Sequence, residues 1–275
     1  MKAGAEIFDN VRHLAEHAQV LEAVVRYFSN RSEIAGAFVS GSLVTGGMDQ
    51  FSDLDLGFLC KDTDSRSKIW GERWDWNIAP WFHRFDADHI KPNFVIYFFE
   101  PDIHVDLCFY VQDDLPTQRG APFKVAWDST ALLTPWARSM NSWPAASPEW
   151  SHAVHEDERF WAWIHYSLSH VRRGEYYDIA SYFYALRGIV EQWHARLSGS
   201  AEFETRRLEM RADPSVVSHL GLCFPNPDLS SLKSSLQALI DIHQSQRMRV
   251  ASVAKVRWNV SDATRERLRK VVDGL

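Results

Sequence analysis

The chain has 275 residues, 45% of them hydrophobic, and a formal net charge of −6 at neutral pH. This length suits two domains of ordinary size, and the composition excludes a disordered protein. The acidic balance argues against non-specific nucleic-acid binding, which needs a basic surface, and no run of about eighteen apolar residues predicts a membrane span. The N-terminus lacks a signal peptide's apolar segment, and Cys60, Cys108 and Cys223 match neither a disulfide framework nor a CxxC metal site. We therefore expect a cytoplasmic protein without nucleic-acid or membrane partners.

The first half of the chain predicts a mixed β-sheet with helices on it. Apolar residues spaced three and four apart from Ile7 to Phe28 predict one amphipathic helix that ends near Asn30. A second helix is predicted over residues 65–79. Apolar runs predict the strands, and Pro101-Asp102 between two of them predicts an antiparallel hairpin. The predicted strands cover residues 34–40, 54–60, 94–100, 103–111 and 123–127.

The second half predicts helices alone. Prolines interrupt the pattern between residues 112 and 148, so we place a boundary there and expect domains of residues 1–140 and 141–275. Beyond it, apolar residues recur every three or four positions, as in a helical bundle. Four long helices are predicted, around Phe160–Val171, Ile179–Leu197 and Leu232–Val253 and from Asp262 onward. The predicted fold class is α+β: a mixed β-sheet domain with flanking helices, followed by an all-α helical bundle domain.

Two aspartates stand one residue apart at the start of a predicted strand. Asp53 and Asp55 belong to the segment DLDLGFL. Side chains two residues apart on a strand point to the same face, and carboxylates that close repel each other unless a proton or a cation lies between them. Mg²⁺ takes oxygen ligands and is usually held by one or two carboxylates together with substrate phosphates. The pair therefore predicts a divalent-metal site.

Gly41 and Ser42, separated from Asp53 by ten residues, predict a phosphate site beside this metal site. A glycine lets the backbone approach a phosphate closely, and backbone N–H groups at a helix start bind anions together with a serine hydroxyl. A third carboxylate, Asp106, lies in the middle of a predicted strand, where an unpaired charge is costly to bury. If the two strands are neighbours, three carboxylates can hold two metal ions roughly 3.5 to 4 Å apart.

These residues resemble the motif of the DNA polymerase β-like nucleotidyltransferase superfamily. The motif consists of GS, ten residues, D-x-D and an acid on a later strand, and it corresponds to Gly41, Ser42, Asp53, Asp55 and Asp106. The specific part of the resemblance covers residues 34–111. A helical domain follows, with Arg173-Gly174-Glu175 expected to open its second helix, and this order is most similar to the lincosamide and aminoglycoside nucleotidyltransferases.

The resemblance implies an enzyme that transfers a nucleoside monophosphate to a hydroxyl of a small acceptor, with AMP from ATP as the expected donor among nucleoside triphosphates. Asp53 and Asp55 would bind Mg²⁺, and Asp106 would be either a third ligand in a two-metal site or the general base. Ser42 and the Gly41 backbone would hold the β- and γ-phosphates. The helical domain would help to form the acceptor site. With an aminoglycoside or lincosamide as acceptor, the implied role is antibiotic resistance.

Several alternatives stay open at the level of sequence. The acceptor could be a protein, as in antitoxin-type members of the superfamily, or the chain could be a non-catalytic nucleotide-binding module. The aspartates could also be structural, with Asp106 paired to a buried arginine. Arg187 on the second long helix is a further candidate for nucleotide binding, with a surface role as its alternative. The oligomeric state is open, a homo-oligomer included.

Overall fold

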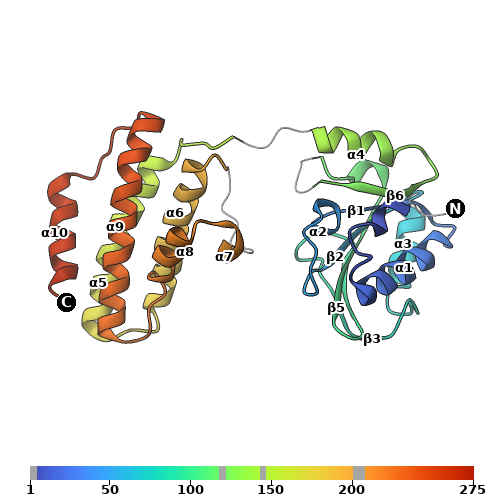
Figure 1. The fold of residues 1–275 in the computed structure, drawn as a ribbon, viewed down its shortest axis with the longest axis horizontal. Coiled ribbons are helices and arrows are strands. Elements are labelled where there is room, and N and C mark those ends of the chain that lie inside the picture. Colours follow the sequence, from blue (N-terminus) through green and yellow to red (C-terminus); the bar gives the residue numbers. More distant parts are fainter. Residues whose placement is uncertain (1–4, 118–121, 143–146, 201–207) are drawn as a thin grey trace. The chain divides into compact units, whose positions relative to one another are not determined.

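The computed structural model describes residues 5–117, 122–142, 147–200 and 208–275. The chain forms two compact units, Met1–Pro144 and Ala145–Leu275, which Figure 1 shows as an α/β part and a helical part. In the described ranges, no helix combines the length and apolar character that crossing a membrane requires. The predicted α+β fold class is confirmed, since in the residues that the structure describes one mixed sheet with flanking helices is followed by helices alone.

The first unit is built on a six-stranded sheet in the order β3-β4-β5-β2-β1-β6. Neighbouring strands are antiparallel except for β2 and β5, which are parallel. The predicted hairpin is confirmed as the antiparallel pair β4 and β5. The strands are β1 (Ile34–Val39), β2 (Leu54–Cys60), β3 (Trp81–Asp86), β4 (Phe94–Phe99), β5 (Ile103–Tyr110) and β6 (Lys124–Asp128).

Helices bury one face of this sheet and leave the other partly open. Because strand side chains alternate between faces, Leu56, Phe58 and Leu107 all lie in the core cluster that also contains α1 and α3 residues. On the opposite face α4 packs against Phe38 of β1 through Leu133. The helices of this unit are η1 (Ala5–Phe8), α1 (Ala15–Ser29), α2 (Ser42–Thr45), α3 (Thr63–Gly71), η2 (Gln112–Asp114) and α4 (Leu133–Ser142).

Two predicted helices of this unit differ from the observed ones. The helix predicted from Ile7 is interrupted, because residues between η1 and α1 turn towards α2, where the Asn10 amide donates a hydrogen bond to the Leu43 carbonyl at 2.8 Å. The helix predicted over residues 65–79 ends at Gly71. Beyond that point the chain no longer follows a helical period, and the Trp76 ring enters the core beside Phe28, 5.0 Å between ring centroids.

The strand β3 and the helix α4 were not predicted. β3 is an edge strand whose first three side chains are exposed, so its sequence WFHRFD lacks the alternation of a half-buried strand. α4 contains Pro135, which reads as a helix breaker in sequence. Proline is tolerated in the first helical turn, where its missing N–H has no intrahelical partner.

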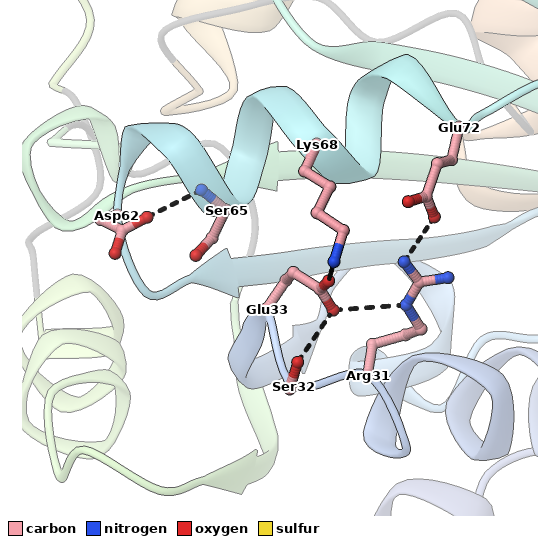
Figure 2. Close-up of polar contacts among 7 residues, drawn as sticks. All are labelled: Arg31, Ser32, Glu33, Asp62, Ser65, Lys68 and Glu72. Carbon is pink, nitrogen blue, oxygen red and sulfur yellow. Dashed lines mark hydrogen bonds and ion pairs between the residues drawn. The ribbon is translucent and has the colours of Figure 1, made fainter.

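A buried carboxylate, Glu33, joins the start of β1 to α3, as Figure 2 shows. Its side chain is only 8% exposed and pairs with Lys68 of α3. It also accepts hydrogen bonds from Arg31 and Ser32, both at 3.4 Å, and Arg31 in turn pairs with Glu72 at the end of α3. The bond from Lys68 is the largest cause that lowers the pKa of Glu33 to about 2.

We expect Glu33→Gln to lower the free energy of unfolding of the first unit by about 1–2 kcal/mol at neutral pH, because hydrogen bonds to a charged group are lost while the exposed Lys68 end is screened by solvent. The folded pKa of Glu33 lies below its unfolded value of 4.5. Its contribution is therefore fully present above the unfolded pKa and is lost as the pH falls through the folded pKa.

Urea denaturation followed by tryptophan fluorescence, at neutral pH and near pH 3, measures this difference. Glu22→Gln on the exposed side of α1 is the matched control and should have little effect at either pH. A Glu33→Gln loss that equals the control, or that is as large near pH 3 as at neutral pH, contradicts the prediction.

The second unit is a helical bundle in which α5, α6, α9 and α10 lie side by side (Figure 1). Its core contains a buried ion pair, with Arg247 Nε 2.8 Å from Asp157 Oδ1. His243 stacks on Phe160 with ring centroids 3.7 Å apart, and burial keeps its pKa well below the ordinary value. The helices are α5 (Ala153–Arg173), α6 (Ile179–Leu197), α7 (Leu208–Arg211), α8 (Pro214–Gly221), α9 (Leu229–Ala254) and α10 (Asp262–Asp273).

The segment Arg173-Gly174-Glu175 is expected from the sequence to open the second long helix, and this expectation is wrong. Arg173 is the last residue of α5, and Gly174 ends that helix in a left-handed conformation with φ 72°. The next long helix begins only at Ile179. Glycine at this position is the usual helix C-terminus, because it adopts positive φ without steric cost.

Candidate active site

Two predicted site residues meet across the parallel strands β2 and β5. Asp55 is directly opposite Asp106 in the register of this pair. Side chains directly opposed in neighbouring strands lie on the same face of a sheet. This is the partly open face, where the side chain of Asp106 is 21% exposed. The structure therefore brings these two carboxylates to one point that solvent can reach.

Asp53 lies directly before β2 and two residues before Asp55. The alternation of a strand places its side chain on the same face as that of Asp55. Both carboxylates contribute to raising the pKa of His104 on β5. Asp53 therefore belongs to the same electrostatic cluster as the opposed pair.

His104 is a member of this cluster that the sequence interpretation missed. Its Nε2 lies 2.8 Å from Oδ1 of Asp106. The hydrogen bond with Asp106 is the main cause that raises the pKa of His104. Burial acts in the opposite direction and lowers this pKa, but its effect is smaller. The signal was present in the sequence HVDLCF, since His104 precedes Asp106 by two residues and must share its face of the strand.

Gly41 packs directly on the Asp55 carboxylate. It precedes the short helix α2 with φ 65°, a left-handed conformation that favours glycine. A Cβ atom at this position would overlap Oδ2 of Asp55, so only glycine fits between the turn and the carboxylate. The neighbouring Ser40 N–H donates to the Asp55 carbonyl at 3.2 Å, which fixes the end of β1 beside the start of β2.

The side chain of Ser42 is oriented inward at the same turn. Its Oγ atom is buried and has no hydrogen-bond partner among the residues that the structure describes. A buried polar atom of this kind normally has a partner. The hydroxyl is thus an unused hydrogen-bond donor beside Gly41 in the described part of the chain, and its role in phosphate binding stays a prediction.

The opposed carboxylates of Asp55 and Asp106 are the part of the donor set that fits a hard divalent cation. In the described part of the chain, no group of three or more histidine, cysteine, aspartate or glutamate side chains is placed so as to hold a metal ion. The two-metal arrangement, with Asp106 as a third ligand beside Asp53, therefore stays a prediction.

Arg187 lies on α6 in the second unit and has partners there. Its Nε is 3.0 Å from Glu191 one turn further along the helix. Its guanidinium also lies over the Phe224 ring, 4.1 Å from the centroid. These contacts account for its position locally, and its role in nucleotide binding stays a prediction.

Solved structures similar to this chain include several nucleotidyltransferases. The similarity to an aminoglycoside 6-adenyltransferase from Bacillus subtilis covers 93% of this chain and 96% of that one, with 12% identity and a TM-score of 0.39. A nucleotidyltransferase-like protein from Exiguobacterium sibiricum matches over 94% and 88% of the two chains, with 13% identity and a TM-score of 0.33. A CD-NTase from Bradyrhizobium diazoefficiens in complex with GTP matches over 96% of this chain and 84% of that one, with 13% identity and a TM-score of 0.30.

No protein-family model and no curated protein sequence matches the chain. TM-scores below 0.5 at such low identity do not establish a shared activity. The function is therefore inferred from the side chains that the first unit brings together.

Gly41→Ala should destabilise the first unit by more than its backbone conformation explains. An alanine held at φ 65° and ψ −145° costs on the order of 1–3 kcal/mol, and the added methyl group would also displace the Asp55 carboxylate. Asp55→Ala provides the control background, because it removes the carboxylate that the added methyl group would meet while the backbone cost at Gly41 remains. Urea unfolding of Gly41→Ala with and without Asp55→Ala measures the two losses. Equal losses in the two backgrounds would contradict the contact between Gly41 and Asp55.

Proposed function

We propose that the chain is a Mg²⁺-dependent nucleotidyltransferase that transfers a nucleoside monophosphate from a nucleoside triphosphate to a hydroxyl of a small acceptor. The observation that carries this proposal is the register of β2 and β5, which sets Asp55 opposite Asp106 on the open face. The contact of Gly41 with the Asp55 carboxylate and the unpaired Ser42 hydroxyl support it, since the turn that the sequence motif predicts to bind phosphate lies beside the carboxylates.

In this proposal the acidic residues hold the cation and the turn holds the phosphates. Asp53 and Asp55 bind Mg²⁺, which supplies positive charge against the triphosphate when bound. The Gly41 backbone and the Ser42 hydroxyl donate to phosphate oxygens beyond the α-phosphorus. The acceptor oxygen forms a bond to the α-phosphorus while the bond from that phosphorus to the leaving pyrophosphate breaks.

Asp106 and His104 act on the acceptor side of this displacement. As general base, Asp106 takes the proton of the acceptor hydroxyl; as a third metal ligand, it would instead contribute to the charge around the cation. His104 pairs with Asp106 in either case and holds its carboxylate in position. His104 is therefore a positioning residue that acts through Asp106.

The acceptor is proposed to be a small hydroxylated molecule, with aminoglycosides and lincosamides as the first to test. The sequence motif motivates this choice, and the helical unit is proposed to contribute to acceptor binding. A role in antibiotic resistance follows if one of these compounds is modified.

Incubation with Mg²⁺, labelled nucleoside triphosphates and a panel of aminoglycosides and lincosamides should yield a nucleotidylated product. We expect Asp55→Asn and Asp106→Asn each to reduce the rate at least about 100-fold, because each removes a group that stabilises or deprotonates the reacting atoms. Asp102→Asn in the exposed turn between β4 and β5 is the control and should retain full activity.

The outcomes separate the alternatives. Nucleotide binding without any product would indicate a non-catalytic binding module. A nucleotide attached to a co-expressed protein, detected by mass spectrometry, would indicate a protein acceptor. Transfer that survives both Asp55→Asn and Asp106→Asn would overturn the assignment of the site.

A further inference from the structure

A cavity of about 290 Å³ adjoins the two opposed carboxylates on the open face of the sheet. Asp55 and Asp106 line one end of it, and residues further along β2 and β5 line the rest, including Gly57, Cys108 and Tyr110. This volume is at the lower end for small-molecule sites and suits a single ring system. None of the roles assigned to the carboxylates and the phosphate turn uses this space.

The cavity has aromatic walls that depend on a glycine. Any Cβ at Gly57 would overlap the ring of Phe38, so the absence of a side chain there lets this ring extend from β1 across β2. The Phe38 ring lies 5.8 Å from Tyr110 and 5.4 Å from Phe123 between centroids, and all three line the cavity. Aromatic rings that line a cavity favour a planar ligand that stacks on them.

The remaining side of the cavity presents hydrogen-bond donors. The Cys108 thiol and the Tyr110 hydroxyl line this side, and each is a group that can donate a hydrogen at neutral pH. Lys91 interacts with both groups, and its ammonium lies over the Phe94 ring, 4.7 Å from the centroid. Since an ammonium can only donate, these neighbours can accept from Lys91 and still donate their own hydrogens to a ligand.

The size of the cavity distinguishes between the two proposed substrates. A several-ringed acceptor such as an aminoglycoside exceeds the space. A nucleobase is planar, neutral and covalently tied to the phosphates that the adjoining carboxylates and turn would bind. At C6 of a purine or C4 of a pyrimidine, a ring carbonyl can accept hydrogen bonds from Lys91 and Tyr110, whereas an amino group at that position would face other donors.

We propose that this cavity binds the nucleobase of the nucleotide, with a ring carbonyl directed to Lys91 and Tyr110. The position of the phosphates in this inference rests on the proposed nucleotidyltransferase function. The hydrogen-bond donors of the cavity favour guanine, hypoxanthine or uracil. The inferred co-substrate is therefore a nucleotide with one of these bases, and not the ATP that the sequence resemblance implies.

Nucleosides test the base site without phosphate or metal. In a buffer with EDTA, inosine should bind at least about fivefold more tightly than adenosine, because the carbonyl that inosine has in place of the adenosine amino group can accept from Lys91 and Tyr110. The two bases also differ at N1, which is an N–H in inosine and an acceptor in adenosine, so the expected preference requires the carbonyl contact to outweigh this second change. Uridine and cytidine form a second pair with the same difference. Saturation-transfer NMR titrations measure the four dissociation constants.

Lys91→Met and Tyr110→Phe retain most of the side-chain volume and should each remove this preference. Lys61→Met removes an exposed positive charge at the end of β2 and should leave the preference unchanged. Circular dichroism confirms that each variant is folded. The base site is overturned if no nucleoside binds, if inosine and adenosine bind equally, or if the preference survives in both cavity variants.

These results are independent of the transfer assay. Nucleotidyl transfer without any nucleoside preference would overturn the base site and leave the proposed function intact. A nucleoside preference without transfer, in turn, would leave the base site intact and count against the proposed function.

Discussion

The parallel pairing of β2 with β5 is the constraint on which the candidate site depends. Among the described strands it is the one parallel pair in an otherwise antiparallel sheet, and its register sets Asp55 opposite Asp106. Because strand side chains alternate with a period of two, a shift of one residue would move Asp106 to the helix-covered face. The hydrophobic residues that alternate with the aspartates, such as Leu56 and Leu107, hold this register by filling the core between the sheet and α1 and α3. Packing of these hydrophobic residues on one face therefore fixes the position of the carboxylates on the other face.

Two glycines near Asp55, Gly41 and Gly57, each allow a close contact because they lack a side chain, but the contacts differ. Gly41 allows a turn to approach the carboxylate more closely than any other residue would. Gly57 allows the Phe38 ring to lie across β2, which creates an aromatic wall for the adjoining cavity. At Gly41 the missing side chain lets the backbone contact a carboxylate, and at Gly57 it lets an aromatic ring line the cavity. Both depend on close packing, in which a single methyl group must displace its neighbours.

Aromatic residues illustrate how one residue type serves different purposes in this unit. Trp76 is 2% exposed and belongs to the core, whereas Trp81 lies on the edge strand beneath the Arg84 guanidinium, 4.1 Å from the ring centroid. Neither ring lines the cavity beside the carboxylates. Its walls come instead from Phe38, Tyr110 and Phe123, which lie on three different strands or their flanks. A tryptophan-rich segment draws attention in the sequence, but the rings near the site are scattered along the chain.

The sequence by itself determined the local features of this protein: the strands around residues 34–39 and 54–60, the long helices of the second unit, and the shared face of Asp53 and Asp55. These follow from periodicities of two and 3.6 residues, which act within a single element. The tertiary structure decided which strands are neighbours, and with them the meeting of Asp106 with Asp55 and the place of Lys91 at the cavity. It also decided the edge strand β3, whose exposed side chains carry no alternation. Strand order and register arise from contacts between distant residues, and no local period encodes them.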